Sequence, residues 1–384
     1  MKNKSKYILI FAGVVIAALI VSALATVKIL ELSKPAEIQI SAPVTGDGTG
    51  YYRHCYEELN DSEKELYAAI MQSLYSMPEK ITVKPFTDGD FSKVFSAVSL
   101  DNPDMFALGL KGVLDADNKG TYFVPEYTVT AEEYNTMLTA VASKANEILA
   151  GASAYTSVYE RELFVHDYLI NNCVYSTKGD NVNNIYGCLV EGVASCEGYS
   201  RAFQYLLNYL NIDNRLVTGT GSTDDSAPTG HMWNYLLLEG EGYFVDVTWD
   251  DPVTESGNTC IHKYFNINTD YLLKNHDDIV QTLPLCTAKK YNFSVYENNI
   301  FNYADSEAFA GALAASVNSA VQRGYKCVEL KFTDKAALEF AMEQLLNTAA
   351  LPDAYTSAGI QSSADNFNIY YSRDDAHLYL CIYF

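Results

Sequence analysis

A cysteine stands at the point where the sequence predicts the start of a helix. After Cys196, the apolar residues Phe203, Leu206, Leu207 and Leu210 recur at the spacing of one helix face. At a helix start, the free backbone N–H groups and the positive end of the dipole favour a thiolate over a thiol, and the same amides can donate to an oxyanion. Cys196 is therefore a candidate nucleophile, although burial as a structural side chain is the commoner fate of a single cysteine.

A histidine and two aspartates follow in a segment with the pattern of a β-hairpin, in which two apolar runs flank Glu239-Gly240-Glu241-Gly242. If the first two of these residues form the turn, His231 pairs with Thr248, and Asp246 lies diagonally from His231 on the same face, roughly 5–8 Å away between Cβ atoms. If the middle two form the turn, Asp250 faces His231 instead. Both registers remain open, and an ordinary amphipathic hairpin with a surface histidine is the non-functional interpretation.

A cysteine, a histidine and an aspartate make up the groups that nucleophilic catalysis needs. The aspartate fixes the tautomer of the imidazole, the imidazole takes the proton of the thiol, and the thiolate attacks. The chain order Cys196, His231, Asp246 is the order that the papain and transglutaminase architectures share.

The stretch from about Asp167 to His276 resembles the bacterial transglutaminase-like superfamily. The resemblance covers about a third of the chain, and its motifs are specific together although each is weak alone. They are His166-Asp167-Tyr168-Leu169, Tyr186-Gly187-Cys188-Leu189-Val190-Glu191-Gly192, Cys196-Glu197-Gly198-Tyr199-Ser200, His231-Met232-Trp233-Asn234, Asp246-Val247-Thr248-Trp249-Asp250-Asp251-Pro252, and Tyr264-Phe265-Asn266 with His276.

The resemblance implies that Cys196, His231 and Asp246 form the catalytic triad, and it prefers Asp246 to Asp250 as the acid. It also implies a papain-like α+β core. The activity that it implies is thiol acyl chemistry on peptide or protein amides, in which the acyl group passes to water or to an amine.

The sequence predicts neither a cofactor nor a metal. The triad chemistry requires none, and no calcium loop is visible. Cys260-Ile261-His262 with His276 and Cys286 could suggest zinc, but this spacing matches no standard finger. We therefore expect no metal site from the sequence.

Other candidates have weaker patterns. His166 and Asp167 lie on a predicted helix and are expected to pack or cap rather than to catalyse. Tyr186 could supply an oxyanion donor near Cys196, on position alone. A function of a different class is a non-catalytic extracytoplasmic binding module that retains the fold, and the intact cysteine, histidine and aspartate set argues against it.

The charge balance limits the partners of the chain. The 384 residues include 26 Lys and Arg against 48 Asp and Glu, for a formal net charge of −22. Such a surface repels phosphate backbones, so nucleic-acid binding is not expected. The eight cysteines are too few for a disulfide-dense scaffold. If Cys196 is a free nucleophile, at least one more cysteine stays unpaired unless it bonds another chain.

The N-terminus predicts export from the cytoplasm. Residues 7–27 contain no charged side chain, and a helix of that length spans about 30 Å, the thickness of the hydrocarbon core. Three lysines precede the run and Lys28 follows it, which places the N-terminus in the cytoplasm and the rest of a single-pass membrane protein outside. A cleaved signal peptide is the rival interpretation, because Ala23-Leu24-Ala25 is an A-x-A site, and the protein is then secreted. The length of the run favours the uncleaved anchor.

The remaining sequence divides into a linker and three globular regions, so the fold class is α+β, with a papain-like core between two smaller α+β domains and an N-terminal transmembrane helix. The predicted boundaries are 1–30 for the cytoplasmic tip and the anchor or signal peptide, 31–50 for the linker, 51–128 for the N-terminal domain, 129–288 for the catalytic domain and 289–384 for the C-terminal domain.

Periodicity and capping residues locate further elements. Helices are expected at 130–150, with Thr130 as N-cap, and from about Ser157 to Asn171. The C-terminal region predicts strands at Cys327–Phe332, Phe367–Tyr371 and Leu378–Tyr383, and helices at 306–323 and 334–347.

The charge-free run predicts the topology of the protein in cells. A protease added to intact cells should degrade the globular part, because that part is expected outside the cytoplasm while residues 7–27 hold it to the membrane. Immunoblotting against each end of the chain measures the degradation. Full protection of the globular part would contradict this topology.

Overall fold

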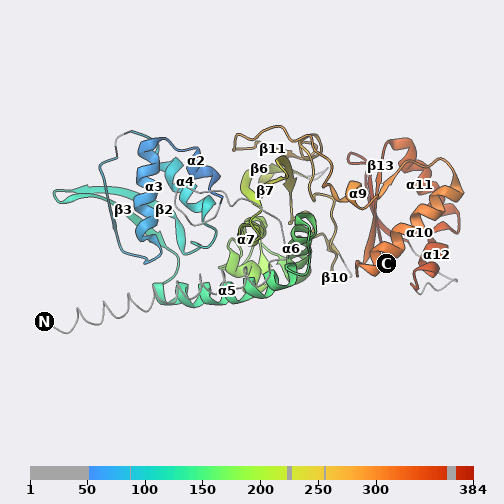
Figure 1. Ribbon diagram of the computed structural model, residues 1–384, viewed down its shortest axis with the longest axis horizontal. Coiled ribbons are helices and arrows are strands. Elements are labelled where there is room, and N and C mark those ends of the chain that lie inside the picture. Colours follow the sequence, from blue (N-terminus) through green and yellow to red (C-terminus); the bar gives the residue numbers. More distant parts are fainter. Residues whose placement is uncertain (1–51, 87, 223–226, 255–256, 361–368) are drawn as a thin grey trace.

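The computed structural model describes residues 52–384, apart from residue 87 and the segments 223–226, 255–256 and 361–368. These residues form three lobes that follow one another in a row, from the N-terminal lobe in blue to the C-terminal lobe in orange and red (Figure 1). The predicted membrane segment 7–27 and the linker lie outside the described residues. Among the helices that are described, none is both long enough and apolar enough to cross a membrane.

The N-terminal lobe packs short helices against a three-stranded antiparallel sheet of order β1-β3-β2. Its elements are α2 (His54–Glu57), α3 (Asp61–Leu74), β1 (Ile81–Val83), α4 (Phe91–Asp101), β2 (Leu108–Asp117) and β3 (Gly120–Tyr127). Helix α3 begins with a capping box, in which Asn60 accepts from the amide of Glu63 and Glu63 accepts from the amide of Asn60. Its apolar residues Leu66, Ile70 and Leu74 are buried in the core of the lobe.

The central lobe packs helices against a four-stranded antiparallel sheet of order β11-β6-β7-β8. Residues 198–208 of α7 are all buried, so this helix lies at the centre of the lobe. The elements are α5 (Ala131–Ala152), α6 (Val158–Asn172), β4 (Val174–Tyr175), the π-helix η1 (Gly187–Glu191), β5 (Val193–Ala194), α7 (Cys196–Tyr209), β6 (Asp213–Gly221), β7 (Thr229–Leu238), β8 (Glu241–Val245), β9 (Val253–Thr254), β10 (Gly257–Asn258), α8 (Thr269–Leu272) and β11 (His276–Asp277).

The two helices predicted ahead of the cysteine are confirmed to within two residues at each end. Thr130 and Ser157 are the N-caps of α5 and α6, and each forms a capping box with the glutamate three residues later. Figure 1 shows α5 running from beneath the N-terminal lobe along the central lobe, where it packs against α6, η1 and α7. The mixed α+β class that the sequence predicts is also confirmed.

Two buried hydrogen bonds fix the helix of the cysteine to the strand of the histidine. The Ser200 hydroxyl of α7 donates to the Met232 carbonyl of β7 at 2.9 Å. The Asn234 side-chain amide of β7 donates to the Ser200 carbonyl at 3.0 Å. Ser200 and Asn234 are 2% and 0% exposed, so water does not compete for either bond. The pair therefore sets the position of α7 along β7.

The hairpin of β7 and β8 has the first of the two predicted registers, because Leu238 pairs with Glu241. The predicted length of the hairpin was wrong. The ladder ends where Asn234 pairs with Val245, and His231 pairs with Gly219 of β6 rather than with Thr248.

The hairpin ends early because the Asp246 side chain competes with the neighbouring strand for the backbone amides that follow it. The Asp246 Oδ1 accepts from the amides of Thr248 and Trp249, each at 3.1 Å. An aspartate that bonds the amides two and three residues ahead bends the chain into a turn. The Asp246 side chain therefore directs residues 247–250 away from the sheet.

The C-terminal lobe has a four-stranded mixed sheet of order β12-β13-β15-β14, covered by helices. Its elements are α9 (Phe293–Tyr296), β12 (Ile300–Phe301), α10 (Ser306–Gln322), β13 (Cys327–Phe332), α11 (Lys335–Asn347), α12 (Ala350–Ser357), β14 (Tyr370–Asp374) and β15 (Tyr379–Tyr383).

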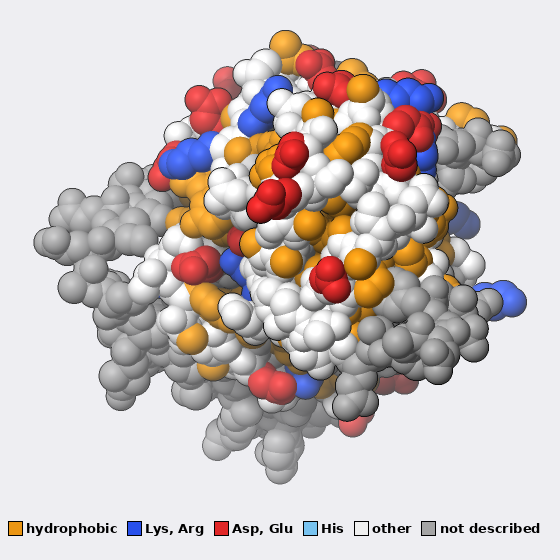
Figure 2. Space-filling view, turned by 90° about the vertical axis from the view of Figure 1, so that its right-hand side faces the viewer, with side chains coloured by type: hydrophobic (Ala, Val, Ile, Leu, Met, Phe, Trp, Pro, Cys, Tyr) orange, Lys and Arg blue, Asp and Glu red, His pale blue; other side chains and the backbone are white. Residues whose placement is uncertain are grey.

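The sequence predicted most of this lobe. The strand at Cys327–Phe332 is confirmed as β13, and α10, α11 and β15 end within one residue of their predicted limits. The strand predicted at Phe367–Tyr371 begins outside the described residues, and the structure has β14 at Tyr370–Asp374 instead. Figure 2 shows the outer end of this lobe, where acidic side chains are scattered among apolar and uncharged ones.

Polar contacts join the lobes to one another. Arg201 of α7 donates to the Ser99 carbonyl of the N-terminal lobe at 2.7 Å, and Arg215 of β6 pairs with Glu58 at 2.6 Å. At the other junction, His262 pairs with Glu329 of β13 at 2.7 Å. Each lobe nevertheless has an apolar cluster of its own, so each of the three lobes has a separate hydrophobic core.

All eight cysteines lie within the described residues, and none of them forms a disulfide bond. Six of them are buried, whereas Cys55 and Cys196 are partly exposed. No disulfide therefore constrains the positions of the lobes in this structure.

The bond between α7 and β7 predicts a cost of removing Asn234. The variant Asn234→Ala should lose about 1–3 kcal/mol of unfolding free energy, because the Ser200 carbonyl remains buried without its donor. Chemical denaturation followed by circular dichroism measures the loss. The exposed Asn135 of α5 serves as control, since Asn135→Ala should change the free energy by less than about 0.5 kcal/mol. Equal effects of the two substitutions would contradict the role given to Asn234.

Candidate active site

Cys196 is the first residue of α7, as the sequence predicted, and its side chain is partly exposed. The N-cap residue Ser195 makes no side-chain capping bond, because its hydroxyl donates to Asn183 instead. The amides of the first turn have no acceptor within the helix and are not capped by Ser195. They remain available to a negatively charged group beside the thiol.

The backbone before and within the first turn of α7 is held closely by the preceding loop. The Ser195 amide donates to the Val182 carbonyl at 2.8 Å. A Cβ atom on Gly198 would lie 2.2 Å from the same carbonyl oxygen. Glycine is therefore the residue that allows the loop to approach the helix, and this approach fixes where the chain enters Cys196.

His231 lies on β7 and hydrogen-bonds Asp246, with 2.7 Å between Nε2 and Asp246 Oδ2. This contact occupies one ring nitrogen. Burial pulls the pKa of His231 down, but the charge and hydrogen bond of Asp246, together with a hydrogen bond and charge interaction with Cys196, raise it to about 10. The structure therefore brings Cys196, His231 and Asp246 together, with the imidazole between the thiol and the carboxylate.

Asp246 is fully buried, and both of its oxygens are hydrogen-bonded. Oδ1 accepts from the two amides of the turn described above, and Oδ2 contacts His231 and the Nε2 of His276, the latter at 3.1 Å. Burial raises the pKa of Asp246, but the two histidines and their hydrogen bonds hold it well below its usual range. The carboxylate is thus kept ionised beside His231.

Aromatic rings enclose the imidazole of His231. Trp233 and Trp249 stack against it, with ring centroids 5.7 and 5.2 Å away. Trp249 reaches this position because Gly221 of β6 has no side chain, since a Cβ atom there would lie 2.8 Å from the indole. The rings shield the His231–Asp246 pair from water and limit the orientations of the imidazole.

His276 is a residue of the site whose contact with Asp246 the sequence did not predict. The sequence singled it out in the motif that resembles the transglutaminase-like superfamily and as a possible zinc ligand, but not as a partner of Asp246. The structure places it on β11, paired with Gly221, where it is fully buried and shares Asp246 Oδ2 with His231. It positions the carboxylate rather than the thiol.

The rival acid Asp250 lies elsewhere. It is fully buried, and its Oδ2 lies 3.1 Å from the Nε2 of His166, while its Oδ1 accepts from the amide of Tyr264. Burial raises the pKa of Asp250 to about 6, although the hydrogen bond and charge of His166 lower it. Asp246, not Asp250, is therefore the acid in contact with His231.

A tyrosine near the thiol differs from the one that the sequence suggested. Tyr186 packs against the apolar core of the central lobe. Tyr175 of β4 is the tyrosine that interacts electrostatically with Cys196. Burial raises the pKa of Tyr175, and the charges of Cys196 and Asp246 raise it further. Tyr175 is 39% exposed, so part of this residue is accessible to solvent.

The set considered for zinc does not assemble. His276 contacts Asp246, and Cys286 lies in a separate apolar cluster with Phe244 and Leu272. Cys260 and His262 instead lie beside His166 and Asp167 of α6.

Comparison with known proteins finds similarity in the central part of the chain. Residues 142–247 match the family model described as the transglutaminase-like superfamily. This stretch of the chain, which contains Cys196, His231 and Asp246, is therefore similar to that superfamily.

The chain also has similarity to solved structures. One is described as a TGase, with 14% sequence identity, a TM-score of 0.27, and coverage of 37% of this chain and 45% of that chain. Another is described as a "Putative Cysteine Protease" from Cytophaga hutchinsonii, with 12% identity, a TM-score of 0.24, and coverage of 36% of this chain and 62% of that chain. The match thus covers less than two thirds of each of these chains. No curated protein matches the sequence.

The contact between His231 and Asp246 predicts how the imidazole titrates. The raised pKa of about 10 means that this pair stabilises the folded state fully below the unfolded value of about 6.5, and that the contribution is lost as the pH rises toward 10. In Asp246→Asn the pKa of His231 should fall markedly, because the opposing charge is gone. NMR titration of ¹⁵N-histidine-labelled protein, with the signal assigned by His231→Gln, measures the change.

The rival acid provides the control for this titration. Asp250→Asn should leave the pKa of His231 unchanged, because Asp250 contacts His166 instead. If Asp250→Asn shifts the His231 signal as far as Asp246→Asn does, the assignment of Asp246 as the partner of His231 is wrong.

Proposed function

We propose that this protein is an exported cysteine enzyme that performs acyl chemistry on peptide or protein amides. The observation that carries the proposal is the arrangement of Cys196 at the start of α7, His231 beside it, and the buried Asp246 carboxylate 2.7 Å from the His231 Nε2. A thiol, a base and an orienting acid in this order are what covalent catalysis by cysteine requires.

In the first step, His231 holds the proton of the Cys196 thiol, and the sulfur attacks the carbonyl carbon of the amide. A C–S bond forms, and the carbonyl electrons move onto the oxygen. When the oxyanion collapses, the C–N bond breaks, and the imidazolium of His231 gives its proton to the leaving amine. The acyl group then remains on the sulfur as a thioester.

In the second step, water or a primary amine attacks the thioester. His231 takes a proton from the attacking group, and the thiolate leaves. Water gives hydrolysis, and an amine gives a new amide bond, so the same residues serve a peptidase, an amidase or a crosslinking enzyme. Asp246 stays ionised throughout and stabilises the imidazolium that forms in each step.

The first turn of α7 provides the donors for the oxyanion. Its amides are not capped by Ser195, whose hydroxyl group is turned to Asn183. Such amides stabilise charge that develops on the carbonyl oxygen, and removing a single donor from a comparable site costs about 10²–10³ in rate. The accessible Tyr175 is placed to contact a substrate beside the thiol.

The substrate class follows from the proposed location. The charge-free run at residues 7–27 and its lysine flanks support export with retention at the cell membrane, and cleavage of that run would release a secreted form. The substrates would then be polypeptides at the cell surface or outside the cell. The net charge of −22 favours neutral or basic polypeptides over acidic ones.

The alternative is a binding module that retains the fold without catalysis. A module of this kind has no need to keep an ionised, fully buried carboxylate against an imidazole, since burying a charge is costly unless function or pairing compensates it. The reactivity of the thiol separates the two possibilities.

The proposal predicts that Cys196 is the thiol that iodoacetamide modifies first near neutral pH. The thiol of Cys196 is partly exposed and hydrogen-bonds His231, which can take its proton, whereas Cys173, Cys188 and Cys381 are buried. Mass spectrometry of the alkylated peptides over time measures the order of modification. Cys196→Ala should abolish hydrolysis or amine transfer on a casein substrate, and His231→Ala should slow the alkylation of Cys196.

The partly exposed Cys55 provides the internal control for reagent access, and burial and the charge of Asp101 raise the pKa of its thiol. If Cys196 reacts no faster than Cys55, and His231→Ala leaves its rate unchanged, the enzyme proposal fails and the binding module takes its place. Circular dichroism of both variants establishes that the fold is intact.

A further inference from the structure

A second group of chemistry-bearing side chains lies at the junction of the central and C-terminal lobes. His166 and Asp167 come from α6, and Cys260 and His262 come from the loop that follows β10. One possible ligand atom from each of these four residues lies within 4.8 Å of the others. The two imidazoles and the thiol are buried, and the carboxylate is about one-fifth exposed. None of the four belongs to the triad.

The distances within this group fit the edges of a tetrahedron around one ion. The Asp167 Oδ1 lies 3.0 Å from the His166 Nδ1, 2.9 Å from the His262 Nε2 and 3.4 Å from the Cys260 Sγ. The Cys260 Sγ lies 3.8 Å from the His262 Nε2. A tetrahedral zinc site with its usual bond lengths has edges of roughly 3.3 Å between nitrogen and oxygen ligands and roughly 3.6 Å to sulfur. Four of the six edges of the tetrahedron are therefore within a few tenths of an ångström of the zinc values, and the other two are no longer than 4.8 Å.

The outer contacts of the four side chains are also those of a metal site. The His166 Nε2 lies 3.1 Å from Asp250 Oδ2, and the His262 Nδ1 lies 2.7 Å from Glu329 Oε1. The Tyr325 hydroxyl donates to the Asp167 Oδ2 at 2.9 Å. Metal-binding histidines almost always donate their other N–H to a carboxylate or carbonyl, which fixes the ring and the tautomer. Each imidazole here directs one nitrogen outward to a carboxylate and the other inward to the group.

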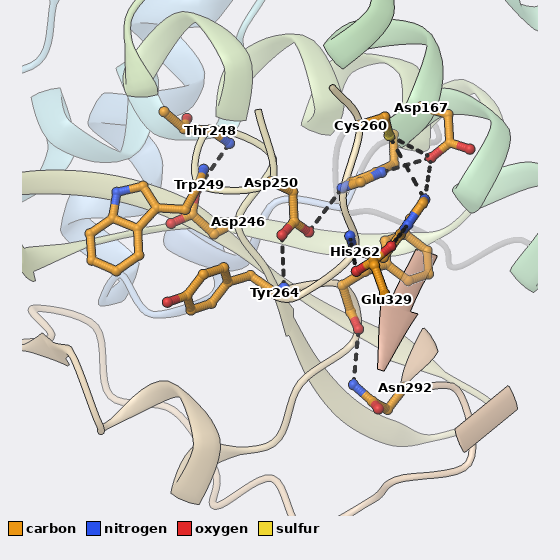
Figure 3. A network of polar contacts seen from close by, with 12 residues as sticks. Asp167, Asp246, Thr248, Trp249, Asp250, Cys260, His262, Tyr264, Asn292 and Glu329 are labelled. Atoms are coloured by element: carbon orange, nitrogen blue, oxygen red, sulfur yellow. Dashed lines mark hydrogen bonds and ion pairs between the residues drawn. The ribbon is translucent and has the colours of Figure 1, made fainter. Parts of the chain in front are cut away.

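Figure 3 shows the same arrangement in space. Asp167, Cys260 and His262 point toward one another, and Glu329 approaches His262 from the strand of the C-terminal lobe. Asp250 extends into the group from the turn that also holds Asp246.

Charge balance favours a cation at this place. Three carboxylates, those of Asp167, Asp250 and Glu329, converge on the group, and Asp250 and Glu329 are 0% and 5% exposed. In the part of the chain that the structure describes, no lysine or arginine pairs with any of the three. A divalent ion would balance the carboxylate and thiolate that bind it directly and attract the two outer carboxylates through the imidazoles.

A groove leads from the solvent to the group. It has a volume of about 590 Å³, and Asp167, Cys260 and Tyr325 line it together with Arg323 and Lys326. The only ligand with appreciable exposure, Asp167, therefore faces the path by which an ion enters.

We propose that His166, Asp167, Cys260 and His262 form a structural zinc site that fastens the C-terminal lobe to the central lobe. Two imidazoles, a thiolate and one carboxylate suit zinc, whereas calcium and magnesium prefer oxygen ligands alone. Four protein ligands leave no open position for a substrate, so the ion holds structure and does not take part in the acyl chemistry. The site does not depend on the function proposed above, because Cys196, His231 and Asp246 are not among its ligands.

The test measures metal in the purified, detergent-solubilised full chain. The protein is stripped with a chelator, titrated with Zn²⁺ in competition with a chromophoric chelator, and examined by metal mass spectrometry. We expect one zinc ion per chain. Co²⁺ should occupy the same site and give the absorption of tetrahedral cobalt with a thiolate charge-transfer band.

Matched variants locate the site. Cys260→Ser should remove the charge-transfer band, and His262→Gln should weaken zinc binding strongly. The buried Cys286 and His377 serve as controls, since Cys286→Ser and His377→Gln should retain one ion per chain. Cys196→Ala should retain the band as well, which separates the result from the triad and from the outcome of the activity assays.

A gentler variant covers the case in which a ligand substitution prevents folding. Glu329→Gln keeps the shape of the side chain that orients His262, and zinc affinity should fall about 10–100-fold while circular dichroism stays unchanged. Stripping the ion should also make the C-terminal lobe more susceptible to limited proteolysis near Tyr325.

Three outcomes would overturn the proposal. The first is an unmodified protein that binds no stoichiometric zinc and gives no thiolate band with Co²⁺, which would leave only a hydrogen-bonded network at the junction. The second is a band that survives in Cys260→Ser. The third is equal loss of the ion in the ligand variants and in the Cys286 and His377 controls.

Discussion

The carboxylate of Asp246 is the group on which the candidate active site depends. It has no exposure to solvent, and its two oxygens receive four hydrogen bonds, two from backbone amides of its own turn and two from His231 and His276. A buried carboxylate is costly unless it is paired and fully hydrogen-bonded, and here both conditions are met. The same bonds that keep it ionised also stop the β7–β8 ladder at Val245 and set the direction of the following turn. One side chain therefore sets the charge state of His231 and the path of the chain beside it.

The position of the Cys196 thiol relative to His231 and Asp246 depends on α7, which several contacts hold in place. Ser200 and Asn234 fix the helix to β7 through buried hydrogen bonds, and the close approach of Val182 to Gly198 fixes its first turn. The Arg201 contact with Ser99 lies on the outward side of the same helix, where the N-terminal lobe packs. A helix held by backbone-directed bonds at several points keeps Cys196 in place with little freedom, which is the condition for a nucleophile to work at a fixed distance from its base.

The sequence predicted what local chemistry determines. The N-cap Thr130, the helix that starts near Ser157 and the start of α7 at Cys196 each follow from residues close together in the chain, and the structure confirms them. Of the two hairpin registers that the sequence left open, the structure has the one that pairs Leu238 with Glu241. The sequence could not predict contacts between residues that are far apart in the chain. The residues around His276 in the sequence do not indicate that it contacts Asp246. Those around Cys260 do not indicate that it lies beside His166 and Asp167, more than ninety residues earlier in the chain. The length of the hairpin was wrong for a related reason, because a pairing rule does not include the competition of the Asp246 side chain for the amides of Thr248 and Trp249.

The two aspartates that the sequence left as rivals turn out to serve two different histidines from a single turn. The amide of Asp250 donates to the carbonyl of Asp246 at 3.2 Å, so the two residues belong to one hydrogen-bonded turn. From that turn Asp246 reaches His231 and His276, while Asp250 reaches His166 at the junction with the C-terminal lobe. A displacement of the turn would therefore change both contacts at once. An ion bound at the junction would hold His166, through it Asp250, and through the turn the carboxylate that orients His231. The C-terminal lobe, which adds Glu329 to this chain of contacts, thereby supports the geometry of a triad to which it contributes no residue.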